Sequence, residues 1–472
     1  MNQSFIKKLS ILLIAFVFMF LVSCEIETKP VDDSTDVEMP KEFAINEGTL
    51  IFEEEEGLRY RIEISDGELT FKRWVNSGQN LNDLNIPEGD YMIKLQAVKG
   101  TNESEFTEAL SYHQIDLYRV YEIKGTDLID GKYIKWMGRT SYDEVKEVNT
   151  VYYTAGGFSV KVKAAEEELT LTAVITGTNT STVSKQPYIV LVMDNEFDNA
   201  ITLTLTKPET EVVLIGEGGF ASPTDGEIHE VSVYKRSESI DSHIALKSLV
   251  TSGKFIEGVE YKERKIEVIA ASSSTGYGNL SNSTKTTANS DGLKAFAFLT
   301  AQALDAELSI VSASGWGISA SAWTSPQTIN MHDKYFMVDC FSNEAWDTSK
   351  YTPDVIVTNF GTNDLSYINL GRNDAEKAER RENFIATYVD FLDRLQRTYP
   401  DAQIIILYGL MNESGVYADH EEIYARAKQI IPNLEMIKIN GDAKGYNSHP
   451  SVTSHAAIAQ TLTQKIKDLM GW

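Results

Sequence analysis

The most informative segment of the sequence reads Ile266-Glu267-Val268-Ile269-Ala270-Ala271-Ser272-Ser273-Ser274-Thr275-Gly276-Tyr277-Gly278. An apolar run rich in β-branched residues ends abruptly in small residues, hydroxyls and two glycines. This pattern predicts a buried strand that stops at a tight turn. Because ligands of α/β folds bind at the carboxyl ends of such strands, a serine in this turn is a candidate nucleophile. A serine-rich loop without chemistry is the alternative.

Strands and helices alternate along the chain after this segment. We expect strands at 266–270, 308–312, 355–360, 403–408 and 436–439, and helices at 293–306, 375–397, 421–427 and 454–469. Alternation of this kind predicts a parallel sheet with helices on both faces. The last domain is therefore expected to be an α/β/α domain that spans 258–472.

The chain before this domain shows mainly β patterns. Residues 47–112 alternate with a period of two, most clearly at 59–64 and 91–97, which predicts a small immunoglobulin- or fibronectin-like β-sandwich that acts as a spacer. Residues 113–247 contain many short strands separated by turn signals, which predicts a jelly roll. A linker is expected near 248–257. A length of 472 residues agrees with two or three domains.

The N-terminus has the pattern of a secretory signal. Lys7 and Lys8 precede an apolar run over 9–22, and a small residue comes directly before Cys24. The run 21–24 resembles the bacterial lipobox, whose cysteine is lipidated, and several acyl chains anchor a protein stably to a membrane. A transmembrane anchor is the alternative, but the apolar run is short for that.

These features predict a signal peptide over 1–24, a flexible acidic linker over 25–46, and a membrane-anchored lipoprotein in the periplasm or at the cell surface. The only other cysteine is Cys340, so lipidation of Cys24 leaves no pair for a disulfide. The net charge of -26 argues against nucleic acid as a partner. His332 and Asp333 lack a second ligand cluster at metal spacing, so no metal site is expected.

Three further motifs accompany the serine turn. They are Ser312-Ala313-Ser314-Gly315-Trp316-Gly317, Asn359-Phe360-Gly361-Thr362-Asn363-Asp364 and Tyr446-Asn447-Ser448-His449-Pro450-Ser451. Two of them follow predicted strands, and the third precedes the last predicted helix. The serine turn and these motifs are therefore expected to converge on one crevice.

Acyl transfer needs the residue types that these motifs carry. Ser272 supplies a hydroxyl nucleophile, and His449 supplies a base that titrates in the required range. The N–H groups of Ser272 and Gly315 and the amide of Asn363 supply donors for an oxyanion. A lone histidine or asparagine is more often structural. The combination at successive element ends favours catalysis.

The motifs resemble those of the SGNH (GDSL-type) hydrolases. The resemblance rests on Gly361-Thr362-Asn363-Asp364, on His449-Pro450-Ser451 and on the serine turn, which with Gly276-Tyr277-Gly278-Asn279 is most similar to carbohydrate esterase family 2. Members of that family carry an N-terminal jelly roll, which Gly138-Arg139 and Tyr234-Lys235-Arg236-Ser237-Glu238 resemble. The resemblance covers about 118 to the C-terminus.

This resemblance implies an esterase that removes acetyl groups from acetylated polysaccharides such as xylan or glucomannan, without a metal or an organic cofactor. It selects Ser272 over Ser273 and Ser274 as the nucleophile. Two positions depart from the family pattern. Ala270 and Ala271 replace a Gly-Asp pair, and Asn447 stands where an aspartate usually orients the base.

Aromatic residues near the motifs are candidates for contact with sugars. Tyr277 and Trp316 are expected to stack on sugar rings, whereas Trp323 and Trp346 are expected to pack internally. The predicted fold is an all-β sandwich and a jelly roll followed by the α/β/α domain. Two other functions remain open: a surface glycan-binding protein that lost turnover because of the changed motif, and an SGNH lipase or thioesterase.

Overall fold

The computed structural model of the protein describes residues 37–46, 48–67, 69–84, 86, 89–114, 120–164, 168–411 and 414–472. They fall into two compact units, of which the first ends at Arg119 and the second is Val120–Trp472. The predicted signal peptide and its Cys24 lie outside the described residues. Within the described ranges, no helix combines the length and the apolar character needed to cross a membrane.

The first unit consists of antiparallel strands around a small apolar core. Alternate residues of β3 (Arg59–Ser65) are buried, namely Tyr60, Ile62 and Ile64, as expected for a half-buried strand. The main sheet has the order β4-β3-β5-β6, with β7 also paired to β5. Its other strands are β4 (Thr70–Val75), β5 (Gly89–Lys99), β6 (Asn102–Glu103) and β7 (Leu110–Gln114), and a separate pair is β1 (Ala44–Asn46) with β2 (Thr49–Ile51).

The second unit begins with a jelly roll of two antiparallel sheets that enclose one apolar core. One sheet contains, in spatial order, β10 (Thr140–Asp143), β11 (Val148–Val151), β18 (Ile244–Thr251), β13 (Leu171–Gly177) and β16 (Glu209–Ile215), with β8 (Glu122–Lys124) on β18. The other contains β15 (Ile201–Thr204), β14 (Tyr188–Met193), β17 (Ile228–Lys235), β12 (Gly157–Lys163) and β19 (Lys254–Ile256), with β9 (Ile134–Met137) on β12.

The expected linker over 248–257 is largely strand. β18 continues to Thr251 and pairs with β13, and β19 pairs with β12. Both strands bond to partners distant in sequence, so the local pattern of polar and apolar residues did not reveal them. The jelly roll therefore extends to Ile256 rather than ending at 247.

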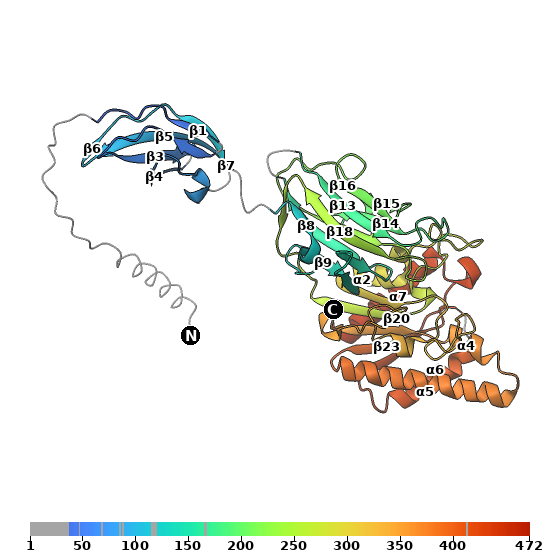
Figure 1. Cartoon of the computed structure of the whole chain (residues 1–472). Helices are drawn as coiled ribbons and strands as arrows, with labels where there is room; N and C mark the ends of the chain where they lie inside the picture. The colour runs from blue at the N-terminus through green and yellow to red at the C-terminus, as the bar shows by residue number, and fades with distance from the viewer. Residues whose placement is uncertain are drawn as a thin grey trace, which may run out of the picture. The chain divides into compact units, whose positions relative to one another are not determined.

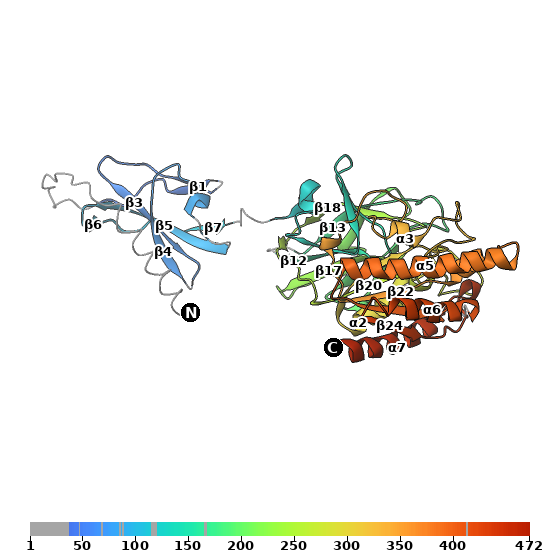
Figure 2. The same ribbon diagram turned by 90° about the horizontal axis from the view of Figure 1, so that it is seen from below.

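A five-stranded parallel sheet follows, as the alternation of elements predicted. Figure 1 shows this sheet between two layers of helices, and Figure 2 shows the same layers from below. Its strands, in spatial order, are β21 (Ala306–Ser312), β20 (Arg264–Ala270), β22 (Val355–Asn359), β23 (Gln403–Tyr408) and β24 (Leu434–Lys438). The helices are α2 (Phe296–Ala303), α3 (Met331–Lys334), α4 (Thr362–Ile368), α5 (Asp374–Thr398), α6 (Tyr417–Ala427) and α7 (Val452–Met470).

Successive residues of each strand enter different cores. In β23, Ile404 and Ile406 pack with α5 and α6, whereas Ile405 and Leu407 pack with α2 and α7. This alternation follows from the two-residue period of a strand. A strand buried on both faces is mostly apolar, which explains the nearly continuous apolar runs in the sequence.

The jelly roll and the parallel-sheet domain share their cores. Val190 and Val192 of β14 belong to the apolar cluster that covers α2 and α7. The same boundary holds a buried ion pair, because the guanidinium of Arg139 lies 3.3 Å from the carboxylate of Glu267, and neither side chain is more than 1% exposed. Residues 120–472 therefore form one packed body rather than two joined by a linker.

Candidate active site

The candidate site lies at the carboxyl ends of β21, β20 and β22, which are neighbours in the parallel sheet. Ala270 at the end of β20 is opposite Ser312 on one side and opposite Asn359 on the other. The three strands therefore end at the same level, and the turns that follow them meet. The predicted site residues on these turns and before α7 are Ser272, Gly315, Asn363 and His449.

Ser272 and His449 have the geometry of a nucleophile and its base. The Nε2 atom of His449 lies 2.7 Å from Ser272 Oγ. Ser272 is half-buried, whereas Ser273 and Ser274 are buried. Only the first serine of the run is thus both accessible and in contact with an imidazole, which agrees with the choice of Ser272 as the nucleophile.

A backbone carbonyl orients the imidazole. The Nδ1 atom of His449 lies 2.8 Å from the carbonyl oxygen of Tyr446. The side chain of Asn447, which stands at the position of the usual orienting aspartate, does not take that role, because it is exposed and the residue has a left-handed backbone with φ of 50°. Ser448 is left-handed as well, with φ of 62°. Two such residues in succession are rare outside glycine and turn the chain so that the Tyr446 carbonyl faces His449.

Gly278 allows the His449 loop to approach the serine turn. A Cβ atom on Gly278 would lie 2.4 Å from Tyr446 Cβ, which is far closer than two carbon atoms can pack. The Gly278 carbonyl accepts a hydrogen bond of 3.1 Å from the Tyr446 N–H. The glycine after the serine turn is thus needed to place the carbonyl that orients the base.

Burial lowers the pKa of His449 below its usual value of 6.5, although the carbonyls of Tyr446 and Asn447 oppose this shift. A base must be neutral to accept the proton of Ser272. We therefore expect kcat/KM for an acetyl ester to rise with pH through a midpoint below 6.5 and to reach its plateau near neutral pH. A pH profile with a substrate that does not titrate measures this, and a midpoint at or above 6.5 would contradict it.

The serine turn is held by its own hydroxyl groups, since Ala271 supplies no polar side chain there. Ser273 Oγ donates a short hydrogen bond to the side-chain oxygen of Asn359, whose amide in turn donates to the Leu407 carbonyl at 2.7 Å. Ser274 Oγ donates to the Ala271 carbonyl at 3.1 Å. The second and third serines of the run therefore fix the turn where Ala271 has no polar group. We did not predict this role, although Asn359 belongs to a motif that the sequence shows.

Two candidate donors for an oxyanion lie on the neighbouring turns. Gly315 is left-handed with φ of 82°, a conformation that favours glycine. Asn363 lies in the first turn of α4, and its amide donates to the Trp316 carbonyl at 2.8 Å. Since an amide NH₂ carries two hydrogens, Asn363 can both brace the Gly315 turn and donate to a ligand.

Asp364 holds the next part of this loop. Its buried carboxylate accepts hydrogen bonds from the N–H groups of Ile318 at 3.1 Å and Ser319 at 2.9 Å, and from the Ser319 hydroxyl at 2.7 Å. Burial raises the pKa of Asp364, and these hydrogen bonds oppose the shift. The residue next to Asn363 is thus a structural support of the site.

The aromatic side chains near the site differ from the expectation. The Tyr277 ring lies 4.5 Å from that of His449, which places it at the site. Trp316 is only 5% exposed and packs against Phe341, so the prediction that it stacks on sugars was wrong. Trp323, expected to be internal, is 72% exposed and adjacent to Gly315, since a Cβ on that glycine would lie 3.4 Å from Trp323 Cβ. Trp346 is buried, as expected.

We expect the Trp323→Ala variant to bind a polysaccharide substrate about two- to tenfold more weakly, because a stacking aromatic contributes roughly 0.5–1.5 kcal/mol. The effect should appear in KM for acetylated oligosaccharides and much less in turnover of a small aryl acetate, which has no sugar rings for the indole to stack on. Steady-state kinetics on both substrates measure this difference. Replacement of the buried Trp316 by alanine should instead lower the melting temperature.

Other histidines have structural surroundings. His455 is 1% exposed and accepts a hydrogen bond from the Phe296 N–H at 3.2 Å, and burial lowers its pKa to about 4. His332 lies between Asp333 at 2.7 Å and Asp390 at 2.6 Å. Among the residues that the structure describes, no group of three or more histidine, cysteine and acidic side chains is placed to hold a metal ion.

Comparison with known proteins gives related esterases, although no family model matches the chain. The cellulase/esterase CelE of Acetivibrio thermocellus is 30% identical over 258 residues, which cover 52% of this chain and 30% of CelE. An acetylxylan esterase / glucomannan deacetylase of Cellvibrio japonicus is 28% identical over 348 residues, which cover 72% of this chain and 90% of that protein.

A solved structure of a family two carbohydrate esterase from Cellvibrio japonicus is similar in fold. It has a TM-score of 0.61 and 25% identity, and the match covers 75% of this chain and 98% of that one. This share of the chain accommodates the jelly roll together with the parallel-sheet domain. Over the jelly roll and the parallel-sheet domain, the chain is therefore similar to the enzymes of carbohydrate esterase family 2.

Proposed function

We propose that the protein is a serine esterase that removes acetyl groups from acetylated polysaccharides through an acyl-enzyme. The observation that carries this proposal is the contact of 2.7 Å between His449 Nε2 and Ser272 Oγ, with Nδ1 held by the Tyr446 carbonyl. A carbonyl accepts a hydrogen bond only from a protonated nitrogen, so it fixes the proton on Nδ1. Nε2 is then free to accept the proton of Ser272.

The first half of the reaction acylates Ser272. Its Oγ attacks the acetyl carbonyl carbon while its proton passes to His449 Nε2, and the carbonyl oxygen becomes an oxyanion. The N–H groups of Ser272 and Gly315 and the amide of Asn363 are the donors for that oxyanion. The tetrahedral intermediate collapses, the sugar oxygen leaves with the proton from His449, and the acetyl group remains on Ser272.

The second half releases acetate. Water attacks the acetyl carbon and gives a proton to His449. His449 then returns that proton to Ser272 Oγ as the second tetrahedral intermediate collapses and acetate leaves. The Tyr446 carbonyl stabilises the transient imidazolium through its dipole, whereas an aspartate would add a full charge. The dyad is therefore expected to turn over more slowly than a triad.

The proposed substrates are acetylated xylan or glucomannan and their oligosaccharides. The Cellvibrio relative carries the name acetylxylan esterase / glucomannan deacetylase. The exposed indole of Trp323 beside Gly315 and the Tyr277 ring beside His449 offer flat apolar faces of the kind that sugars stack on.

We also propose that Cys24 is lipidated and that the protein is anchored to a bacterial membrane, facing the periplasm or the cell exterior. This proposal rests on the basic residues, the apolar run and the lipobox-like sequence before Cys24. This location at the membrane would bring the esterase to polysaccharide fragments outside the cytoplasm. Metabolic labelling with a palmitate analogue, compared between the wild type and Cys24→Ala, tests it.

The test of the enzyme function measures acetate release by the wild type. Acetylated xylan, acetylated glucomannan and an aryl acetate should all yield acetate, and an acid quench during aryl acetate turnover should trap an acetyl group on the peptide that carries Ser272. An aryl ester of a long fatty acid is the control, because a lipase would prefer it. Glycan binding without acetate release would instead favour a binding protein that has lost turnover.

A further inference from the structure

The segment Ser237-Glu238-Ser239-Ile240-Asp241, one residue after the end of β17, brings the jelly roll into the candidate active site. It follows the sequence Tyr234-Lys235-Arg236, which has no role in the mechanism above. Arg236 donates to the carbonyls of Ser290 at 3.0 Å and Ala288 at 2.8 Å and thereby fixes the segment to the loop that follows the serine turn. The segment is therefore tied to the hydrolase domain at its start.

Glu238 and Ser239 contact the turn that carries Gly315. Ser314 Oγ donates a short hydrogen bond to one carboxylate oxygen of Glu238, and Ser239 Oγ donates to the Ser312 carbonyl at 3.0 Å. Glu238 is 2% exposed and Ser239 is 4% exposed. The jelly roll thus forms hydrogen bonds to Ser312 and Ser314, which lie on either side of Ala313 and immediately before the candidate oxyanion donor Gly315.

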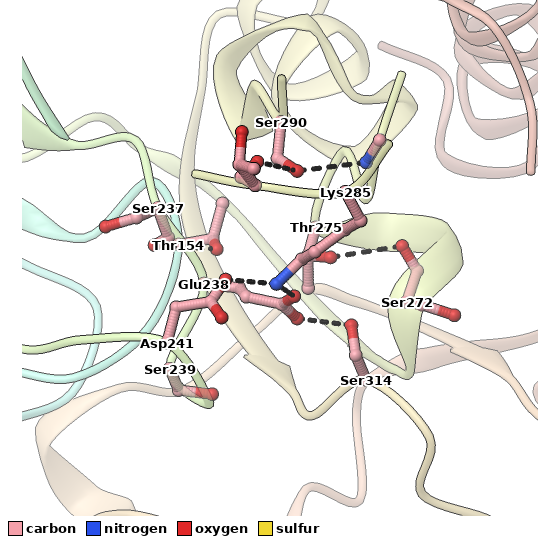
Figure 3. A network of polar contacts seen from close by, with 12 residues as sticks. Thr154, Ser237, Glu238, Ser239, Asp241, Ser272, Thr275, Lys285, Ser290 and Ser314 are labelled. Atoms are coloured by element: carbon pink, nitrogen blue, oxygen red, sulfur yellow. Dashed lines mark hydrogen bonds and ion pairs between the residues drawn. The ribbon is translucent and has the colours of Figure 1, made fainter. Parts of the chain in front are cut away.

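The other oxygen of Glu238 lies 2.9 Å from the ammonium of Lys285, which also forms a short ion pair with Asp241. Figure 3 shows Glu238 between Lys285 and Ser314, with Ser272 nearby. Burial alone would lower the pKa of Lys285, but Glu238 and Asp241 outweigh this effect and raise it, so the ammonium stays charged. The ammonium lies 5.1 Å from the centre of the Tyr277 ring, which in turn packs against His449.

The Gly315 turn needs such an anchor for a physical reason. The candidate donor is the N–H of the peptide bond between Ser314 and Gly315, and glycine occupies left-handed and right-handed conformations at similar cost. Rotation of this peptide would turn its N–H away from an oxyanion. A donor contributes to catalysis only when it is fixed toward the position that the oxyanion will occupy. A bond to the Ser314 side chain opposes this rotation.

We propose that Glu238 of the jelly roll is a positioning residue that fixes the Ser314–Gly315 peptide as an oxyanion donor and holds Lys285 against Tyr277 beside the base. This inference rests on the proposed esterase function. It makes the jelly roll a part of the catalytic apparatus, in addition to any contact that it makes with glycan.

Three variants test the inference on an aryl acetate. Glu238→Ala and Ser314→Ala should each lower kcat by about 10²-fold, toward the loss seen when one oxyanion donor is removed, while KM changes by less than about threefold. Ser314→Thr keeps a hydroxyl and should recover most of the rate. The double variant Glu238→Ala/Ser314→Ala should lose little more than either single variant, because both act through one contact.

Glu307→Gln provides a matched control. Glu307 forms a buried ion pair of 3.3 Å with Lys135 across the same boundary, at the opposite end of β21. Its loss should lower the melting temperature but leave kcat unchanged. Glu238→Gln, which keeps the shape and an acceptor for Ser314, supplies a soluble variant if Glu238→Ala does not fold, and it should lose less of kcat.

The outcomes separate the inference from the function on which it rests. Absence of acetate release by the wild type would overturn the esterase proposal. The rate at which a fluorophosphonate labels Ser272 would then test the inference, because that reaction also places a negative oxygen in the same position. The inference is overturned if the Glu238 and Ser314 variants keep wild-type rates, if Glu307→Gln loses as much kcat, or if the losses of the double variant multiply.

Discussion

Replacement of Ser272 by alanine should lower kcat for acetate release by about 10⁴- to 10⁶-fold, with KM nearly unchanged. The variant lacks the oxygen that accepts the acetyl group, and His449 loses the hydroxyl at 2.7 Å from its Nε2 atom. Residual turnover would come from the oxyanion donors and from substrate binding alone. Acetate release from an aryl acetate, followed over hours with the variant at high concentration, measures this loss.

Ser273→Ala is the matched control for that variant. The neighbouring hydroxyl is buried and bonds to Asn359 rather than to His449. Its removal leaves a buried acceptor unsatisfied, so the free energy of unfolding should fall by about 1–3 kcal/mol while kcat stays within about tenfold. If Ser273→Ala abolished turnover and Ser272→Ala did not, the nucleophile would have to be reassigned.

Replacement of Asn363 by alanine should lower kcat by about 10²- to 10³-fold, which is the usual cost of one oxyanion donor. The change removes the amide that faces the turn and leaves the Trp316 carbonyl without the hydrogen bond of 2.8 Å. Because the amide acts mainly on the charged intermediate, KM should change far less than kcat. Steady-state kinetics with an aryl acetate separate the two constants.

Asn369→Ala offers the comparison for that loss. Asn369 follows the last residue of the same helix and is exposed. Its replacement should leave kcat and KM at their wild-type values. Comparable kcat losses in the two asparagine variants would mean that the helix, and not the amide of Asn363, is what the reaction requires.

The sequence predicted the parallel sheet well because its strands are buried on both faces and so form continuous apolar runs. The expected bounds 403–408 agree with β23, and the expected helix 375–397 agrees closely with α5. The antiparallel strands were harder to predict. β18 has polar residues such as Lys247 and Ser248, and its stability comes from pairing with distant strands, which no local pattern reports.

The candidate site was predictable as far as it depends on motifs. The sequence placed Ser272 and His449 together, but it could not show that a backbone carbonyl replaces the expected orienting side chain, because left-handed residues such as Ser448 have no strong sequence signal. It also could not distinguish Trp316 from Trp323, since both lie in one loop and only packing decides which is buried. Tertiary contacts, such as that of Glu238 with Ser314, are beyond any local pattern.

The shared cores of the jelly roll and the parallel-sheet domain bear on how this protein can evolve. Without α2 and α7, Val190 and Val192 of the jelly roll would be exposed to solvent. If the two domains were separated, Arg139 and Glu267 would each lose the partner of a buried ion pair. Gene rearrangement that cut the chain between these two parts would therefore expose apolar and charged surface on both. It cannot readily separate the jelly roll from the parallel-sheet domain, and the two are expected to be inherited together.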